Sequence, residues 1–453
     1  MTGPPSGPEA VARRWDPLAA GSANLFWAKI AGNGGYFVAV LLVARGLGPA
    51  GRGTVAFITV TALVVAHIAG LGVGESTTVL AARRPGSRAV LLANALIFFL
   101  GSGLVAATLT LLGLQLSGIE PAGVGTPELV ILGLGIVSCA AGEAGYSFLL
   151  GVERLRQLAF VTGCASWVYA LLVLVLWAGP GLTVGRAALA WTVTEGLRAV
   201  ALISLSSRGT RLGRPSRGLL LEEVSFGIRL WVGSLARFLN FRTDQILMGF
   251  LASEAALGFY AVAVNASEVL LYLPSSTAAA LLPLIARTEP ARWGEATLRA
   301  FRSVAFVTVA GVAAAALLGP VILPAVFGEP FHESVGPFLW LLPGTLGFAA
   351  SSVFSNALVG SSSPGLSSLG PIVSLLVGFG LDLALIPRFG ATGAAAAASA
   401  AFLAGGTTAL VTYHRVSPFT WRALLVPHRG DLDVLLALVG PLLRLPLPRR
   451  GAS

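Results

Sequence analysis

Charged residues are scarce in this sequence. Only 11% of the 453 residues are charged, whereas soluble domains usually carry about 25%. The sequence holds a single lysine, Lys29, and two cysteines, Cys139 and Cys164, both inside long apolar runs. A water-soluble fold and a framework of disulfide-linked loops are therefore excluded. The use of arginine almost without lysine is typical of a GC-rich bacterial genome.

The motifs of several enzyme classes are absent as well. A Walker A loop needs Gly-Lys-Ser/Thr, but Lys29 stands between Ala28 and Ile30. Neither His-Glu-x-x-His nor Gly-x-Ser-x-Gly occurs, and the four histidines lack the spacing of metal ligands. Asp431 and Asp433 match a short acidic motif of glycosyltransferases, but no soluble domain surrounds them. We therefore expect a protein that is not an enzyme and that needs no cofactor or metal.

Long apolar runs are what the sequence has in abundance, since 55% of its residues are hydrophobic. Each run of roughly 20 residues is long enough to cross a hydrocarbon core about 30 Å thick as a helix. The sequence therefore predicts an all-α polytopic membrane protein of about twelve transmembrane helices. The expected spans are 20–44, 53–74, 89–113, 128–150, 158–178, 185–206, 225–250, 256–284, 303–325, 337–359, 369–387 and 391–413.

The net charge of +10 comes from arginines that gather on one side of these spans. Arginines gather before the first span and after the second, fourth, sixth, eighth and twelfth spans, whereas the opposite loops carry few arginines and several glutamates. By the positive-inside bias, both termini and the arginine-rich loops are cytoplasmic. The basic charge therefore indicates topology in a bacterial inner membrane, and we expect no nucleic-acid partner.

The second half of the chain resembles the first at an offset of about 205 residues. Gly53, Thr54, Val55 and Ala56 align with 258–261, and three glycines further along align at an offset of 209. Six spans in each half give both halves one orientation, so we expect two six-helix bundles around a central cavity. The expected divisions are an N-terminal tail 1–19, bundles 20–206 and 225–413, a linker 207–224, and a cytoplasmic tail 414–453.

Ten ionisable residues fall inside the spans. At roughly 2.5–3.5 kcal/mol each, lipid-facing positions for all ten would cost on the order of 25–35 kcal/mol, so they must face an interior or a watery cavity. They are Lys29, Arg198, Arg229, Arg237, Arg242, Glu143, Glu195, Asp244, Glu268 and Asp382.

A polar stripe follows the seventh span. At about 100° per residue, Arg229, Gly233, Arg237, Asn240 and Asp244 fall within roughly an 80° arc, and Arg242 points elsewhere. The same spacing groups Lys29, Asn33 and Tyr36 in the first span, and Asn265, Glu268 and Tyr272 in the eighth. One interpretation is that these charges pair between helices, as Glu195 with Arg198 or Arg237 with Asp244. The other is that the cations line a cavity and bind phosphate, which guanidinium groups contact in bidentate geometry.

Three motifs resemble a known family. The sequence Val43-Ala44-Arg45-Gly46-Leu47-Gly48-Pro49, continued by 51–53, resembles the loop after the first helix of polysaccharide-exporting flippases. Asp244-Gln245-Ile246-Leu247 with 257–260, and the run 385–395, are similar to two further motifs of these proteins. They form the Wzx-like branch of the multidrug/oligosaccharidyl-lipid/polysaccharide (MOP) exporter superfamily, and the resemblance covers about 20–413. One departure is Asp382, where the family often has Asn.

The resemblance implies two bundles whose cavity opens alternately to each side while an undecaprenyl-pyrophosphate-linked oligosaccharide crosses. We predict such a flippase, with membrane lipids, a proton or sodium ion, and a glycan polymerase or glycosyltransferases as candidate partners. A drug/cation antiporter of the same superfamily and a membrane-embedded glycan polymerase or ligase are the alternatives. The predicted substrate-binding residues are Lys29, Asn33, Arg198, Arg229, Arg237 and Asn240, and the predicted ion-coupling residues are Asp244 and Glu268.

Overall fold

The computed structural model describes residues 8–119, 121–272, 274–275, 278, 293–361 and 364–425, with side chains from residue 32 onward. Every regular element in these ranges is a helix. Nine of the described helical segments are long and apolar enough to cross a membrane. Of the predicted tail 414–453, the part from residue 426 on, with Asp431 and Asp433, lies outside the described residues.

The first half of the chain contains six long or medium helices. Short 3-10 turns precede α3 and α4, at Pro85–Ser87 and Pro121–Gly123. The helices are α1 (Pro8–Ala69), α2 (Val73–Arg83), α3 (Arg88–Ser117), α4 (Thr126–Gly151), α5 (Leu155–Ala178) and α6 (Val184–Ser207).

The second half begins at Arg217, earlier than the span expected from residue 225, because Ser216 caps the helix by accepting a hydrogen bond from the Leu219 amide. A 3-10 turn, Val269–Leu271, extends α9. Another turn, Glu329–Ser334, precedes α12, and the short α13 (Pro364–Ser367) and α15 (Arg422–Leu425) flank α14. The longer helices are α7 (Arg217–Leu239), α8 (Thr243–Leu251), α9 (Glu254–Glu268), α11 (Trp293–Phe327), α12 (Val335–Gly360) and α14 (Leu369–Val416).

Two of the helices each contain two predicted spans. The backbone of α1 leaves helical geometry at Gly48, where φ is 68°, and that of α14 does so at Gly390, where φ is 53°. Only glycine adopts such angles readily, so the chain turns back into the membrane at both points. Together with the broken pair α7 and α8, these kinked helices confirm the predicted all-α membrane fold of about twelve spans.

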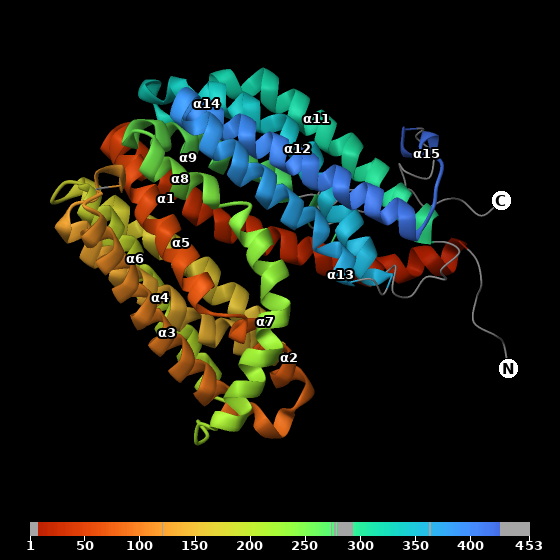
Figure 1. Ribbon diagram of the computed structural model, residues 1–453, viewed down its shortest axis with the longest axis horizontal. Coiled ribbons are helices and arrows are strands. Elements are labelled where there is room, and N and C mark those ends of the chain that lie inside the picture. Colours follow the sequence, from red (N-terminus) through yellow and green to blue (C-terminus); the bar gives the residue numbers. More distant parts are fainter. Residues whose placement is uncertain are drawn as a thin grey trace.

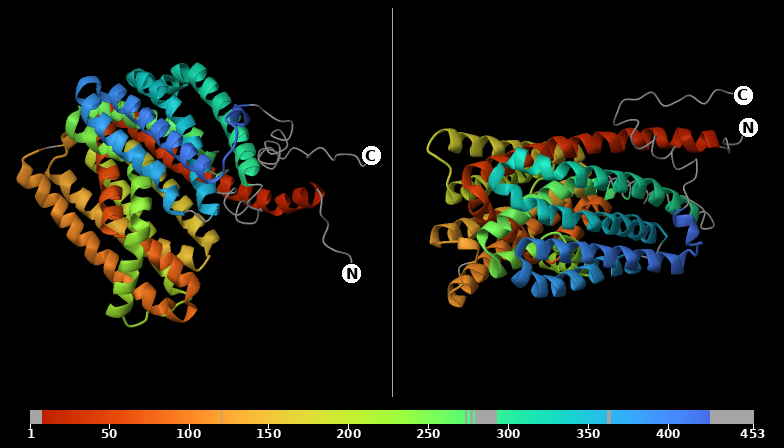
Figure 2. Two further views of the ribbon diagram at one scale, coloured as in Figure 1. Left: turned by 45° about the vertical axis from the view of Figure 1, so that its right-hand side comes forward. Right: turned by 90° about the horizontal axis from the view of Figure 1, so that it is seen from above.

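The helices form two arms that meet at one end and diverge toward the other. One arm contains α3 to α6 and the other contains α11, α12 and α14, while α8 and α9 lie where the arms meet (Figure 1). The same divergence is visible after rotation of the molecule (Figure 2). The joined end carries Glu128 and Glu254, and we call it the acidic end. The opposite end of the helices carries Arg84 and Arg154, and we call it the basic end.

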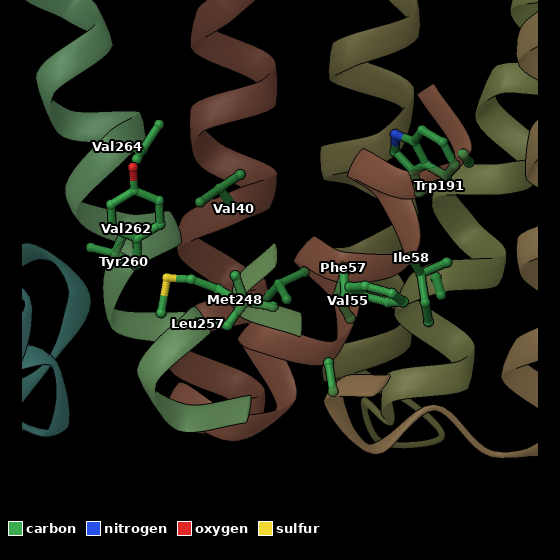
Figure 3. Close-up of a cluster of buried hydrophobic side chains, with 14 of the residues drawn as sticks. Val40, Val55, Phe57, Ile58, Trp191, Met248, Leu257, Tyr260, Val262 and Val264 are labelled. Carbon is green, nitrogen blue, oxygen red and sulfur yellow. The ribbon is translucent and has the colours of Figure 1, made fainter. Parts of the chain in front are cut away.

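A shared hydrophobic core connects the arms near the acidic end. Phe57 and Val40 from the two parts of α1 belong to the same buried cluster as Met248 of α8 and Tyr260 of α9 (Figure 3). Trp191 extends this cluster into α6. The two halves of the chain are therefore one packed unit at this end.

The helix α7 packs against the first half although it belongs to the second half in sequence. Its Gly227 lies so close to Gly72, just before α2, that an added Cβ would be 2.3 Å from the Gly72 carbonyl oxygen. Glu222 of α7 forms an ion pair of 2.7 Å with Arg84. At its other end, Asn240 donates a hydrogen bond of 2.8 Å to the Pro371 carbonyl in α14. This single helix therefore connects both arms (Figure 1).

Candidate substrate cavity

Arg198, a predicted substrate-binding residue, lies in α6 and is paired with a carboxylate. Its Nη2 and Nε atoms lie 2.5 Å and 2.7 Å from Oε2 of Glu195, one helical turn away. Both side chains are largely buried, with exposed fractions of 16% and 15%. The pairing that the sequence suggested for these two residues is present. It neutralises a charge that would otherwise be costly inside a membrane.

A second ion pair links α8 to α9. Nη1 of Arg242 lies 2.7 Å from Oε1 of Glu268, which was predicted to couple ion movement to transport. Arg242 immediately precedes α8, and Glu268 is the last residue of α9. Because Glu268 already compensates Arg242, the pair has a structural explanation independent of a transported ion.

Arg198 and Arg242 line one cavity of about 190 Å³. Residues from α1, α5, α6, α8 and α9 form its wall, so both halves of the chain contribute to it. Of the predicted substrate-binding residues whose side chains are described, only Arg198 lines this cavity. Arg52, which the sequence placed in a loop outside the membrane, also lines it and is only 4% exposed.

The predicted residues of the first span lie in the part of α1 that precedes the kink. Asn33 donates a hydrogen bond of 2.9 Å from Nδ2 to the hydroxyl of Tyr272, which follows α9. Tyr36, one turn further along α1, lines the cavity. The side chain of Lys29 lies outside the described residues.

The polar stripe predicted along the seventh span is interrupted. The helix α7 ends at Leu239 and α8 begins at Thr243, so residues 240–242 break the continuous helix on which the stripe was built. The placement of Asp244 on one face with Arg229 and Arg237 is therefore wrong. This break could not be predicted from the sequence, because it contains neither proline nor glycine.

Arg229 and Arg237 do share α7 and are both exposed. Nε of Arg229 donates a hydrogen bond of 3.1 Å to the Ser225 carbonyl, and its guanidinium lies 6.0 Å from the centre of the Phe226 ring. Within the described chain, Arg237 has no hydrogen bond or ion pair, and it interacts at longer range with Glu75 of α2. The predicted contact between Arg237 and Asp244 is therefore not formed.

Asp244 is instead buried at the start of α8. Its Oδ1 accepts a hydrogen bond of 2.7 Å from the Gln245 amide, and its Oδ2 accepts one from the hydroxyl of Tyr260. Asp382 of α14 is only 3% exposed, and its Oδ1 has no hydrogen-bond partner in the described part of the protein. The two carboxylates are close enough to interact electrostatically. Buried carboxylates inside a membrane protein are suited to binding a proton or a small cation.

The sequence pattern of a known protein family matches much of this chain. The family is described as polysaccharide biosynthesis protein, and the match covers residues 18–289. The chain belongs to this family. Membership confirms the resemblance to Wzx-like exporters that the three motifs indicated. No curated protein sequence matches the chain.

Solved structures of MOP transporters share the fold of this polysaccharide biosynthesis protein. An inward-facing multidrug resistance MATE family transporter of the MOP superfamily superposes with a TM-score of 0.69 at 18% identity, over 84% of this chain and 94% of that one. The lipid II flippase MurJ, in an inward closed conformation, gives 0.71 at 12% identity, over 92% and 97%. A MOP superfamily transporter from Pyrococcus furiosus gives 0.61 at 17% identity, over 88% and 96%. At these identities the likeness establishes the fold.

Proposed function

We propose that this polysaccharide biosynthesis protein is a flippase that carries an undecaprenyl-pyrophosphate-linked oligosaccharide across the bacterial inner membrane. The basic end faces the cytoplasm, and the cavity opens alternately to either side. The divergence of the arms toward the basic end represents the state that receives substrate from the cytoplasm. Family membership supports this function, and the scarcity of catalytic motifs supports transport without covalent chemistry.

The observation that carries the proposal is the free guanidinium of Arg237. It lies in the last turn of α7, the helix that connects the two arms (Figure 1), and within the described residues it has no ion-pair partner. From the expected span 225–250 we infer a depth near the middle of the membrane. A charge held there without compensation is costly unless a ligand or water receives it. Pyrophosphate is a suitable ligand, because a guanidinium binds phosphate oxygens in bidentate geometry. Arg229 lies on the same helix, closer to the basic end, and would extend the phosphate-binding surface toward the cytoplasm.

The other predicted substrate residues have supporting positions in this proposal. Lys29 and Asn33 lie on α1, and Arg198 lines the cavity that extends toward the acidic end. Asn240 ties α7 to α14 through the Pro371 carbonyl, so it positions α7. The sugar would pass through the protein while the polyprenyl tail stays among the membrane lipids. Glycosyltransferases would supply the substrate, and a glycan polymerase would receive it.

The test is export of surface polysaccharide by Arg237→Ala in a strain that lacks its own flippase. We expect the variant to insert and fold normally but to lose complementation, because no buried carboxylate is left without a partner. Arg237→Lys should recover only part of the activity, since an ammonium group cannot form the bidentate contact. Arg415→Ala is the matched control, because Arg415 is an exposed arginine at the end of α14. Full export by Arg237→Ala at equal membrane abundance would disprove the phosphate contact.

A further inference from the structure

Arg52 differs from the other arginines of the cavity. It lies one turn after the break at Gly48, where the second part of α1 begins, and it is only 4% exposed. Its Nε atom is buried without a hydrogen-bond partner, and its guanidinium lines the cavity. Among the residues that the structure describes, none forms an ion pair with it. Burial of a guanidinium without a partner costs free energy unless an anion or a water molecule accepts its hydrogen bonds.

The remaining charges of the wall are compensated. Arg198 is held by Glu195, and Arg242 is held by Glu268, both at ion-pair distance. These two pairs leave the cavity wall with the positive charge of Arg52 in excess. One uncompensated guanidinium matches one carboxylate, whereas a pyrophosphate carries at least two negative charges and needs more than one free cation.

The rest of the wall suits a sugar. The rings of Tyr36 and Tyr169 lie 6.5 Å apart between centroids and are inclined by 33°, and both line the cavity. Aromatic faces of this kind pack against the apolar face of a sugar ring. Hydroxyl and amide groups complete the lining and can bind sugar hydroxyls; they include Thr59, Thr194, Gln245 and Asn265.

We propose that this cavity selects an acidic sugar, with the carboxylate bound by Arg52 and the sugar ring packed against Tyr36 and Tyr169. The proposal rests on the proposed flippase function and specifies the class of glycan that is transported. The pyrophosphate of the same substrate would remain with Arg237 and Arg229 on α7. Arg52 is then the residue that distinguishes a uronic acid from a neutral hexose.

Binding of simple sugars by the purified full-length protein tests the site without transport. The probes are glucuronate, its uncharged amide and glucose, with inorganic pyrophosphate as a competing anion, and calorimetry measures each affinity. A charge-assisted hydrogen bond contributes enough for a difference of at least about 10-fold. We therefore expect glucuronate to bind at least about 10-fold more tightly than its amide or glucose. Pyrophosphate that bound more tightly than glucuronate, and whose binding also depended on Arg52, would overturn the proposal in favour of a phosphate site.

The variant Arg52→Gln should lose this preference, and Arg52→Lys should keep part of it. Arg388→Gln is the matched control, because Arg388 is exposed and lies outside the cavity. If Arg52→Gln does not fold, Tyr169→Ala provides a second variant. It should weaken the binding of glucuronate and of its amide by the same factor, so that the ratio of the two affinities is unchanged. An unchanged preference in folded Arg52→Gln, or equal binding of all three sugars by the unaltered protein, would refute the carboxylate contact.

Transport in vesicles separates this proposal from the function on which it rests. The two substrates are a polyprenyl-pyrophosphate glycan that ends in glucuronate and one that ends in glucose. Faster transport of the acidic glycan, lost in Arg52→Gln, supports both proposals. Equal transport of both glycans would overturn the acidic-sugar site and leave the flippase function in place. Transport of neither would reject the flippase function, whereas the binding preference of the purified protein would still decide the site.

Discussion

At the level of single residues, three carboxylates near α8 have different surroundings. Glu268 forms an ion pair with Arg242, and Asp244 accepts hydrogen bonds from Tyr260 and from the Gln245 amide. Asp382 has an unpaired Oδ1 in the described part of the chain. We therefore propose that Asp244 and Asp382 bind the coupling cation or proton. The predicted coupling role of Glu268 stays a prediction, since its contact with Arg242 explains its charge equally well.

Substitution of the three acids distinguishes these roles. We expect Asp244→Asn and Asp382→Asn each to flatten the dependence of transport on the proton or sodium gradient, because one negative charge of the site is lost. Glu268→Gln should keep that dependence but lower stability by at most roughly 3 kcal/mol, because Arg242 is left unpaired and the pair is only partly buried. The double variant Arg242→Met/Glu268→Leu should recover most of this loss.

The measurements are substrate transport in vesicles at fixed gradients and the thermal unfolding midpoint of each variant. Glu295→Gln is the control for stability, because its ion pair with Arg299 is exposed and contributes at most about 1 kcal/mol. If Glu268→Gln lost the dependence of transport on the gradient while both aspartate variants kept it, Glu268 and not the two aspartates would be the ion-coupling residue.

At the level of elements, the contact of α7 with α2 and α3 contains a buried carboxylate, Glu223. Its two oxygens accept hydrogen bonds from Thr77 Oγ1 at 3.0 Å and from Asn94 Nδ2 at 2.9 Å. Burial raises the pKa of Glu223 to about 7, although these two hydrogen bonds act in the opposite direction. The adjacent Glu222 is exposed, and its hydrogen bond with Arg84 lowers its pKa. The α7 contact is therefore expected to respond to pH near neutrality.

The direction of this response follows from proton binding. Because the pKa of Glu223 is higher in the folded protein, the folded state binds the proton more tightly than the unfolded state. The stabilisation that comes from the protonated Glu223 is complete when the pH is below 4.5, the ordinary pKa of glutamate. It is lost as the pH rises through about 7. We expect a loss of at most about 3 kcal/mol between pH 5 and pH 8.

Thermal unfolding midpoints of the purified protein between pH 5 and pH 8 measure this effect. Glu223→Gln should match the unaltered protein at pH 5 and exceed its stability at pH 8, since the amide is uncharged throughout. Glu222→Gln is the matched control, because Glu222 is ionised over this whole range and its removal leaves the slope unchanged. A Glu223→Gln variant that kept the full pH dependence would show that another group is responsible.

The elements also show how far the sequence could predict the structure. Runs of apolar residues identified the spans, because crossing the membrane requires length and apolarity. The turns at Gly48 and Gly390 were placed between spans, since glycines and prolines mark them. The break at 240–242 and the packing of α7 on α2 were not predictable, because they depend on contacts between distant segments. The pairing of Glu195 with Arg198 was predicted because the two residues are three positions apart. The pairing of Arg242 with Glu268 was not predicted, because it joins distant segments.

At the level of the whole molecule, the acidic end is held closed by contacts between the two halves. Backbone atoms of Gly53 and Gly258 approach so closely that a Cβ on Gly258 would lie 1.9 Å from the Pro49 carbonyl oxygen. Nε and Nη2 of Arg45 donate hydrogen bonds of 2.8 Å and 2.9 Å to carbonyls at the end of α11. Gly53 and Gly258 are also aligned with each other in the sequence repeat. Contact between equivalent residues is what a two-fold relation between the halves produces.

The proposed alternating access requires this end to open, so Gly258 gives a direct test of that proposal. In Gly258→Ala the new Cβ must move by more than 1 Å to reach even the shortest tolerated contact of 3.0 Å. Such overpacking costs about 1–3 kcal/mol, and it acts only in the state that is closed at the acidic end. The population should therefore shift toward the opposite state by a factor of roughly 5 to 150. Gly336→Ala is the matched control, because its Cβ would meet Thr392 at an ordinary 3.8 Å.

Spin-label distances at both ends of the molecule measure the shift, in a Cys164→Ser background that removes the exposed native cysteine. Thr126→Cys with Glu333→Cys reports on the acidic end, and Ala82→Cys with Arg415→Cys reports on the basic end. We expect Gly258→Ala to lengthen the first distance and to shorten the second, because the arms move as a unit around the shared core. Gly336→Ala should leave both distances unchanged. If folded Gly258→Ala kept both distances of the unaltered protein, the glycine contact would not control access, and the closed acidic end would have to depend on Arg45 and the carbonyls of α11.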